Sequence, residues 1–379
     1  MKAEDRDFLA GLFDAAVAAA DPETALAAHL PDRPRGRTVV VGAGKGAAQL
    51  AAAFERLWDA PVEGVVVTRY GYGCETRGIE VLEAAHPVPD EAGLAAGARL
   101  LDLVSGLTEN DLLIALVCGG GSALLPAPPE GLTLADEIAV NEALLASGAP
   151  ISAMNMVRKH VSRIKGGRLA AATHARVVSL LVSDIPGDNP AAIASGPTIP
   201  DASTRADALA IVAQYRLDLP AAVMTHLNGP AADAPMPDDP VFARHEHHIV
   251  ASARVSLEAA ADEARGRGVM PVILSDAMEG EARDVALVHA AIAREVLARG
   301  RPFSRPAVLL SGGETTVTLR GRGGRGGRNG EFALAMALAI DGHAIEVLAA
   351  DTDGIDGSED NAGAFADGTT VRRLRAAGI

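Results

Sequence analysis

Lysine is scarce in this chain. Only four of its 34 basic residues are lysines, at positions 2, 45, 159 and 165, and the others are arginines. Because arginine fills the generic cationic positions, a retained lysine indicates a place where a compact ammonium on a flexible stem is needed. Codon bias is the alternative explanation. Three of the four lysines lie in glycine-rich or strongly basic motifs, and we treat these three as candidates for a functional role.

Other classes of residue are also rare, and their absence excludes several functions. Aromatic residues make up 3% of the chain, too few for repeated stacking on nucleobases, and the net charge of −15 argues against nucleic acid. No apolar run is long enough to span a bilayer, and the N-terminal segment lacks the pattern of a signal peptide. Cys74 and Cys118 form no metal-binding spacing. We therefore expect a cytoplasmic protein with reduced thiols and small-molecule partners.

The order of the apolar runs predicts an α/β fold. Short β-branched runs alternate with alanine-rich helical segments along residues 38–182. Such alternation is typical of a Rossmann-like, mostly parallel sheet with helices on both faces, and ligands then bind outside the carboxyl ends of the strands. Residues 217–243 are rich in proline and aspartate and lose this periodicity. We expect an N-terminal nucleotide-binding domain over residues 1–243 and a smaller mixed α/β domain over residues 244–379.

The motif GAGKGA matches a dinucleotide fingerprint. Gly42, Gly44 and Ala47 fit the pattern G-x-G-x-x-A between an apolar strand and a helix. A Rossmann site also needs an acidic residue at the end of the second strand, to bind the ribose. Here that strand ends in Arg69, which suits the 2′-phosphate of NADP instead. Lys45, in the middle of the turn, favours the other interpretation, a loop whose lysine binds phosphate.

A second glycine-rich turn, CGGGS, follows the apolar run LLIALV. Gly119, Gly120, Gly121 and Ser122 stand between this strand and the next helical segment. Consecutive glycines let backbone N–H groups converge on an anion, and a helix N-terminus adds positive potential. The turn is neither a Walker A loop nor a nucleophile elbow. We expect it to bind nucleotide phosphates, with a flexible turn as the alternative.

Two polar stretches flank the next apolar strand, VVSLLV. The preceding stretch, RKHVSRIKGGR, is either a solvated basic face or a segment that brings Lys165 to the active edge. The following stretch holds Asp184 and Asp188 in SDIPGDN, and then Ser195 and Gly196 in SGPT. Carboxylates at the carboxyl end of a strand suit Mg²⁺ or a substrate hydroxyl. Capping of the loop by its own side chains is the alternative.

The C-terminal part carries three further polar motifs beside expected strands: SGGETTV, GGRNGE and AADTDGIDG. They contribute Glu314, Arg328 and Asp353 to the candidate site. The last motif resembles a calcium loop, but Ile355 and Asp356 occupy positions where an EF-hand needs a ligand and a glycine. We therefore do not expect an EF-hand.

Taken together, these motifs resemble the glycerate 2-kinase family, whose carboxyl-terminal part is called the MOFRL domain. Some members carry an older label of hydroxypyruvate reductase. The resemblance covers nearly the whole chain, through GAGKGA, HPVPDEAG, CGGGSALL, KHVSRIKGG, SDIPGDNPAAIASGPT, GGETTV, GGRNGE and DTDGIDG. It implies two α/β domains with the active site in the cleft between them. The implied reaction is phosphoryl transfer from ATP, with Mg²⁺, to the 2-hydroxyl of D-glycerate, and a homodimer is left open.

The resemblance also implies roles for the candidate residues. Lys45 would contact the transferring phosphate, and Arg328 would do the same or bind the substrate carboxylate. The nucleotide would be bound by glycines, hydroxyls and one lysine: Gly42, Gly44, Gly119, Gly120, Gly121, Ser122, Lys165, Ser195 and Gly196. Four carboxylates would bind Mg²⁺ or act on the substrate hydroxyl, with Asp184 placed with catalysis and the other three with the metal: Asp184, Asp188, Glu314 and Asp353. The residues alone do not divide these four roles.

The chain departs from the family pattern in three places. Gly330 stands where the family has glutamine, and Asn189 stands where it has a second aspartate. The chain ends at RRLRAAGI, before a further helix and a final strand that the family leads us to expect. Two rival functions are therefore kept. One is an NADPH-dependent hydroxypyruvate reductase, supported by GAGKGA and Arg69, and the other is a nucleotide sensor without catalytic activity.

Overall fold

The chain folds into two compact units, which we describe separately. The structure is a computed structural model that describes residues 1–318, 325–357 and 360–379. One unit consists of residues 22–252, and the other combines residues 1–21 with residues 253–379. The expected division at 243/244 differs from this in two places. The last strand of the first sheet follows residue 243, and the N-terminal helix packs with the C-terminal part of the chain.

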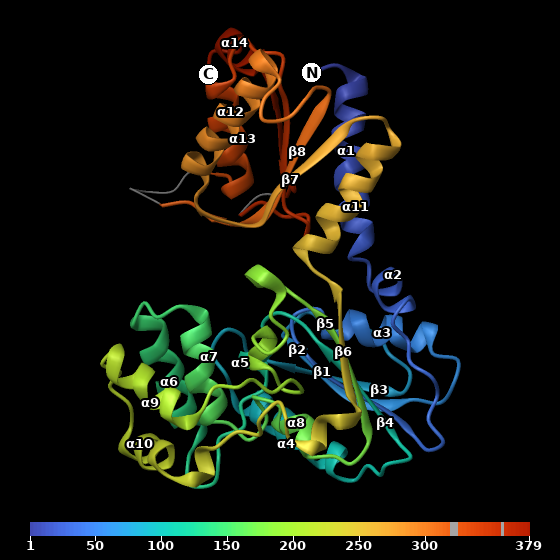
Figure 1. Cartoon of the computed structure of the whole chain (residues 1–379), viewed down its shortest axis with the longest axis vertical. Coiled ribbons are helices and arrows are strands. Elements are labelled where there is room, and N and C mark those ends of the chain that lie inside the picture. The colour runs from blue at the N-terminus through green and yellow to red at the C-terminus, as the bar shows by residue number, and fades with distance from the viewer. Residues whose placement is uncertain (319–324, 358–359) are drawn as a thin grey trace. The chain divides into compact units, whose positions relative to one another are not determined.

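The unit of residues 22–252, which we call the N-terminal unit, is built on a parallel sheet of six strands (Figure 1). Its strands are β1 (Thr38–Ala43), β2 (Glu63–Arg69), β3 (Ile79–Ala84), β4 (Leu112–Val117), β5 (Arg176–Val182) and β6 (His245–Ala251). Their spatial order is β3-β2-β1-β4-β5-β6, with parallel pairing throughout. This is the doubly wound order, in which the chain changes direction across the sheet between β1 and β4. A ligand site is therefore expected outside the carboxyl ends of these two strands.

The central strands β1 and β4 are buried on both faces because they are apolar at nearly every position. Along β1, Val39 and Val41 pack on one face with Leu100 of helix α4 (Glu91–Ser105), and Val40 packs on the other face with Phe54 of helix α3 (Ala47–Leu57). All three valines are fully buried. Alternate side chains of a strand point to opposite faces, so a continuous apolar run fits a sheet covered by helices on both sides. This confirms the predicted Rossmann-like α/β class.

The described part of this unit contains nine α-helices. They are α2 (Pro22–Ala27), α3 (Ala47–Leu57), α4 (Glu91–Ser105), α5 (Gly121–Leu124), α6 (Leu134–Ala146), α7 (Ile151–His160), α8 (Arg168–Ala171), α9 (Arg205–Gln214) and α10 (Ala221–Asn228). Helices α6, α7, α9 and α10 form a separate group beside the sheet, with a hydrophobic core of their own (Figure 1). This helical group contributes Asn155, on α7, to the loops at the active edge.

The C-terminal unit is a smaller mixed α/β structure. Its elements are α1 (Ala3–Ala19), α11 (Ala253–Gly266), β7 (Met270–Glu281), α12 (Ala282–Arg299), β8 (Ala307–Thr316), α13 (Arg328–Ala339), β9 (Glu346–Ala350), β10 (Gly363–Asp367) and α14 (Thr370–Ala376). Strands β7 and β8 pair in parallel, and β9 and β10 pair antiparallel. Helix α1 packs against α11 through Leu12, Ala260 and Ala264. Residues 319–324 of the Gly/Arg stretch before α13 lie outside the described residues.

No helix in the described part of the chain combines the length and the hydrophobicity needed to cross a membrane.

Candidate active site

The loop after β1 does not offer its backbone to a ligand. Its N–H groups already donate within the protein: Gly44 N to Val67 O (3.1 Å), Lys45 N to Gly119 O (2.9 Å), Gly46 N to Cys118 Sγ (3.2 Å) and Ala47 N to Gly44 O (3.1 Å). A Rossmann fingerprint needs such N–H groups for the pyrophosphate. The glycines serve packing instead. A Cβ at Gly42 would overlap Leu116 O, and a Cβ at Gly44 would overlap Cys118 Sγ. Gly42 and Gly44 were expected to bind the nucleotide, but in the structure they allow close packing of the loop against β4 and Cys118.

The turn after β4 does offer its backbone. Among the described residues, no acceptor receives a hydrogen bond from the N–H of Gly119 or Gly120. Gly120 has a φ of +81°, which a glycine adopts without strain. Two neighbouring free N–H groups in such a turn form a concave anion site. This agrees with the phosphate-binding role expected for CGGGS, although that role stays a prediction.

Side chains from neighbouring strand ends surround this turn. A Cβ at Gly119 would overlap the Asp184 carboxylate, which follows β5. A Cβ at Gly120 would lie 3.0 Å from His86 Nε2, which follows β3, and 3.2 Å from Lys45 Cγ, which follows β1. The parallel sheet thus brings Lys45, His86 and Asp184 to one place at its carboxyl edge. We call this cluster, with Gly119 and Gly120, the edge site.

The charges of the edge site act on its own titratable groups. Partial burial, followed by the positive charges of Lys45 and Arg69, lowers the pKa of His86 below its ordinary value of 6.5, while Asp184 acts in the opposite direction. Complete burial raises the pKa of the Cys118 thiol to about 12. Cys118 is therefore a packing residue that accepts a hydrogen bond from Gly46, and it is not a nucleophile.

The expected residues Ser122 and Ser195 lie together. Their hydroxyl oxygens are 2.9 Å apart, and Ser195 Oγ donates to Asn155 Oδ1, also at 2.9 Å. Because the Ser195 hydroxyl donates its hydrogen bond to Asn155, Ser122 must be the donor in the hydrogen bond between the two serines. Ser122 Oγ therefore offers only its lone pairs to a ligand. It is suited to a hydroxyl or ammonium donor rather than to phosphate oxygens, which differs from the role expected for it.

The segment that carries Ser195 has an unusual backbone. Ala194, Ser195 and Gly196 have φ values of +52°, +60° and +59°. Non-glycine residues in this region cost free energy and persist only where neighbouring structure enforces them. Here the N–H groups of Gly166 and Gly167 donate to the carbonyls of Ser195 (3.0 Å) and Gly196 (2.7 Å). The Gly-Gly pair of KHVSRIKGG therefore supports the Ser195 loop.

The structure corrects the role of Lys165. Its ammonium forms a 2.5 Å ion pair with Glu137, and the two side chains are only 2% and 4% exposed. The second Glu137 oxygen accepts from Ala127 N at 3.0 Å. A lysine buried against a buried carboxylate cannot also bind a nucleotide in this arrangement. Lys165 thus belongs to the protein interior, not to the nucleotide site.

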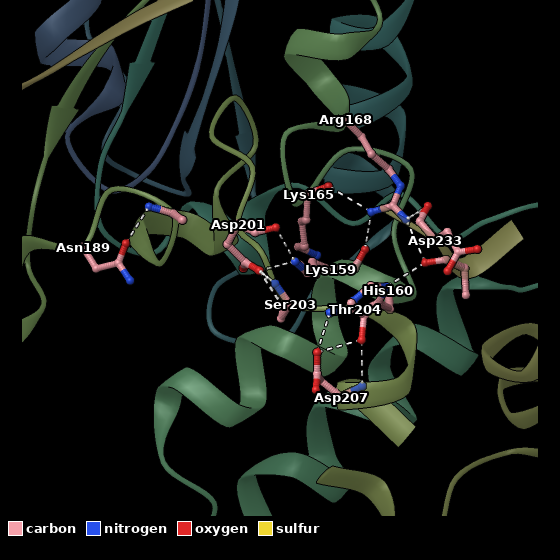
Figure 2. A network of polar contacts seen from close by, with 12 residues as sticks. Lys159, His160, Lys165, Arg168, Asn189, Asp201, Ser203, Thr204, Asp207 and Asp233 are labelled. Carbon is pink, nitrogen blue, oxygen red and sulfur yellow. Dashed lines mark hydrogen bonds and ion pairs between the residues drawn. The ribbon is translucent and has the colours of Figure 1, made fainter. Parts of the chain in front are cut away.

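Two further cations of the basic stretch, Lys159 and Arg168, are also held inside the protein, whereas Arg163 is exposed. Figure 2 shows Lys159 paired with Asp201, and the Arg168 guanidinium donating to backbone carbonyls, including those of Lys159 and Asp233. Burial lowers the pKa of Arg168 to about 10 and lowers that of Lys159. These cations join the turn after α7 to the loops at 201 and 233. Lys159 and Arg168 thus belong to a structural network, rather than to a solvated basic face.

The polar residues of the loop after β5 have different surroundings. Asp184 is exposed and borders Gly119. Asp188 is half-buried with a φ of +50°, so the carboxylate expected to bind metal belongs to a tight turn. Asn189 Oδ1 accepts from Ala191 N at 3.1 Å, a bond drawn in Figure 2. An amide oxygen fills this capping position as well as a carboxylate does, which explains why asparagine is tolerated there.

In the C-terminal unit, Arg328 begins helix α13 and is held by two carboxylates. Its guanidinium contacts Glu314 and donates to Asp351 Oδ2 at 2.8 Å. Partial burial lowers its pKa, but the hydrogen bonds with Asp351 and Glu314 outweigh this and raise the pKa above its ordinary value. Arg328 is therefore a permanent, oriented cation with part of its charge compensated. Asp351 belongs to the motif AADTDGIDG singled out from the sequence, but it was not among the candidate site residues.

The neighbouring loop caps helix α13. Asp356 is buried and accepts hydrogen bonds from the N–H groups of Asn329 (2.9 Å) and Gly330 (2.7 Å). A carboxylate at a helix N-terminus is a favourable cap. Asp353 is exposed and accepts from Ile355 N at 2.9 Å. A Cβ at Gly330 would lie 3.2 Å from Asp356 Oδ2, so a side chain at this position would require the capping carboxylate to shift slightly.

The carboxylates expected to bind Mg²⁺ come from both units, Asp188 from the N-terminal unit and Glu314 and Asp353 from the C-terminal unit. Among the described residues, no three His, Cys, Asp or Glu side chains gather closely enough to hold an ion. Glu314 contacts Arg328, and Asp353 caps its own loop.

Two residues of the site were missed by reasoning from the sequence. His86 is part of HPVPDEAG, and the only available signal was its position directly after the expected strand 79–84. Asn155 is buried on α7 and fixes the Ser195 hydroxyl. Its signal was an amide within a helix that otherwise carries cations. In both cases the residue contacted, Gly120 for His86 and Ser195 for Asn155, is distant in the sequence.

Comparison with known proteins places this geometry in a family. Residues 8–228 match a domain of unknown function, DUF4147, and residues 307–379 match the MOFRL family. A glycerate 2-kinase from Pyrococcus horikoshii is 42% identical over 91% of this chain and 79% of its own. A protein from Agrobacterium vitis, provisionally named hydroxypyruvate reductase, is 51% identical over 99% of this chain and 85% of its own.

A solved structure agrees with these sequence matches. The crystal structure of a glycerate kinase from Thermotoga maritima superposes with a TM-score of 0.90 and 36% identity, covering 100% of this chain and 90% of its own. The sequence matches and the structural match thus extend across both units. The chain belongs to the glycerate 2-kinase family, in which a DUF4147 domain is combined with a MOFRL domain.

Proposed function

We propose that this protein is an ATP-dependent glycerate kinase that transfers the γ-phosphoryl group of ATP to the 2-hydroxyl of D-glycerate. The observation that carries the proposal is the edge site. There the free N–H groups of Gly119 and Gly120 lie beside Lys45, which is exposed and has no ion pair among the described residues. Phosphoryl transfer needs positioning and neutralisation of charge rather than covalent catalysis. These groups supply both.

The rival reductase function needs a dinucleotide site, and the loop after β1 does not provide one. Its N–H groups donate to Val67, Gly119, Cys118 and Gly44. At the end of β2, where a ribose ligand is needed, the Arg69 guanidinium lies 3.5 Å from the centroid of the Tyr72 ring. This favours kinase activity for the chain despite the reductase name that some relatives carry.

The candidate residues divide by unit in this proposal. In the N-terminal unit, Gly119 and Gly120 bind nucleotide phosphates and Lys45 binds the transferring group, whereas the N–H of Gly121 already donates to Cys118 O at 3.3 Å. Asp184 borders the same turn and orients the substrate. In the C-terminal unit, Arg328 binds an anionic group of the substrates, with Glu314 and Asp351 fixing its orientation. Mg²⁺ enters only as part of the Mg·ATP substrate, because this ion commonly keeps several waters and binds through substrate phosphates.

The test of the proposal is a pair of assays on the purified chain. ADP formation from ATP, Mg²⁺ and D-glycerate is measured beside oxidation of NADPH with hydroxypyruvate. We expect turnover in the first assay, its loss when the divalent cation is chelated, and no turnover in the second. NADPH oxidation at rates typical of enzymes, without ADP formation, would replace the kinase by the reductase.

Two glycines with nearly the same backbone provide a matched test of the edge site. Gly120 and Gly131 have φ values of +81° and +84°, so alanine carries a similar backbone strain of about 1–2 kcal/mol at either position. A Cβ at Gly131 meets no atom within 4 Å, whereas a Cβ at Gly120 crowds His86 and Lys45. We expect Gly120→Ala to lower kcat/KM for ATP by about tenfold or more beyond Gly131→Ala. If the two variants had equal kinetics, the turn at Gly120 would not be part of the ATP-binding site.

A further inference from the structure

His86 is the member of the edge site to which the resemblance assigns no role. It follows β3 directly, and its Nε2 atom faces the turn at Gly120. The Lys45 side chain faces the same glycine from the end of β1, and the Asp184 carboxylate borders Gly119 from the end of β5. The imidazole edge therefore lies beside the turn at which the proposed function places the nucleotide phosphates.

The ring of His86 is available to a ligand. Within the described part of the chain, neither ring nitrogen takes part in a hydrogen bond with the protein, and the residue is half-buried rather than enclosed. Other histidines of this unit differ. His160 Nδ1 contacts Ala232 O at 2.7 Å, and His226 Nε2 contacts His160 O at 3.0 Å. His86 thus has unused hydrogen-bonding capacity at the active edge.

We propose that His86 Nε2 accepts the proton of the substrate hydroxyl during phosphoryl transfer. This inference rests on the proposed kinase function. The hydroxyl oxygen forms a bond to the γ-phosphorus, and the bond between that phosphorus and the β–γ bridging oxygen breaks. The electron pair of the broken bond leaves with ADP, and the proton passes from the hydroxyl to Nε2. His86 then returns the proton to solvent, because it is only partly buried.

Its surroundings keep His86 in the form that this step requires. The charged groups that face it are Lys45 beyond β1, Arg69 at the end of β2 and Asp184 beyond β5. Burial and the two cations lower the pKa of His86 and outweigh Asp184. A lowered pKa means that the imidazole is neutral, and can accept a proton, at every pH above about 6.5 and somewhat below it. An aspartate in the same place would be a much weaker base at neutral pH.

The kinetic test compares His86→Gln with the parent and with His174→Gln, an exposed histidine of the same unit. Glutamine can accept a hydrogen bond but cannot hold the proton. We expect His86→Gln to lower kcat by about 10²-fold or more, with the KM for ATP within about threefold of the parent. We also expect kcat/KM for D-glycerate in the parent to fall as pH drops below 6.5, and this fall to be absent in His86→Gln. His174→Gln should match the parent.

A second measurement does not depend on turnover. NMR of the imidazole nitrogens should show His86 titrating below 6.5 in the parent and closer to that value in Lys45→Met, because one of the lowering charges is gone. Adding D-glycerate and the non-hydrolysable ATP analogue AMP-PNP should shift the Nε2 resonance. Circular dichroism of His86→Gln should match the parent, which excludes misfolding as the cause of lost activity.

The outcomes separate the two proposals. A parent without ADP formation contradicts the kinase function itself. A parent that is active, combined with a His86→Gln variant that keeps kcat within about threefold and retains the fall below pH 6.5, contradicts only the role of His86. An Nε2 resonance unaffected by both ligands contradicts it as well.

Discussion

Replacing Lys45 by alanine should lower kcat for phosphoryl transfer from ATP to D-glycerate by about 10²–10³-fold. The KM for ATP should change by about threefold or less. The reason is that an ammonium beside the transferring group stabilises charge that develops in the transition state more than charge already present in bound ATP. An interaction of that kind appears in kcat and not in binding. Steady-state kinetics with varied ATP at saturating D-glycerate measure the two parameters separately.

The structure explains why Lys45 in particular should have this effect. Both backbone polar groups of Lys45 are hydrogen-bonded, since its N–H donates to Gly119 O at 2.9 Å and its carbonyl accepts from Thr68 Oγ1 at 3.0 Å. The side chain leaves this anchored position toward Gly120 and stays exposed. Lys45→Arg should restore little of the activity, because a planar guanidinium does not reproduce a compact point charge on the same stem.

Two controls accompany this prediction. Lys2→Ala removes another exposed lysine, outside the N-terminal unit, and should leave both kinetic parameters unchanged. Binding of NADPH, followed by its fluorescence, should be weak in the parent and in Lys45→Ala alike. A nearly normal kcat in Lys45→Ala would exclude the lysine from the reaction. Tight NADPH binding that Lys45→Ala abolishes would instead restore the dinucleotide interpretation of GAGKGA.

The sequence predicts the architecture of the N-terminal unit well because the pattern of a buried parallel strand is local. The segments at 38–41 and 112–117 are apolar almost throughout, and both lie within fully buried strands of the central sheet. The segment at 79–84 carries two glutamates and forms a less buried strand at the edge of the sheet. Since all carboxyl ends of a parallel sheet lie on one edge, the sequence also predicts that Lys45 and Gly119 come together. The domain boundary was less accurate, because β6 and α1 join their units through contacts distant in the sequence.

The parts of the site that the sequence could not predict depend on partners far along the chain. GAGKGA matches a fingerprint in its letters, yet its N–H groups bond to Val67, Cys118 and Gly119, which no local pattern reveals. Lys165 resembles an active-site cation until Glu137, 28 residues earlier, is found against it. In each case the local sequence is compatible with a functional role and with a structural role, and only the contacts in the folded protein distinguish the two.

The buried pair of Lys165 and Glu137 leads to the second prediction with a large effect. Lys165→Met should destabilise the N-terminal unit by about 3–5 kcal/mol, because it leaves the Glu137 carboxylate buried without its counter-charge. For a unit of this size that corresponds to a fall in melting temperature of roughly 6–20 °C. The single tryptophan, Trp58, is 6% exposed and packs in the core of the same unit. Its fluorescence during thermal or urea unfolding therefore reports on this unit alone.

A double variant separates loss of the ion pair from loss of packing. Lys165→Met combined with Glu137→Gln removes both charges, while the glutamine oxygen can still accept from Ala127 N. Most of the lost stability should return, since replacing both members of a buried ion pair costs far less than removing one. Arg33→Met, which breaks the exposed pair with Asp59, should cost about 1 kcal/mol or less.

The same variants decide between the interior role of Lys165 and the nucleotide-binding role that its motif first indicated. In the interior role, Lys165→Met unfolds early, and at temperatures where it is folded its KM for ATP stays within about threefold of the parent. The double variant then recovers stability without any change in that KM. In the nucleotide-binding role, loss of the Lys165 charge would weaken the binding of ATP and would leave the stability of the unit unchanged. A Lys165→Met protein that unfolds at the temperature of the parent, while its KM for ATP rises by about tenfold or more, would return Lys165 to the nucleotide site.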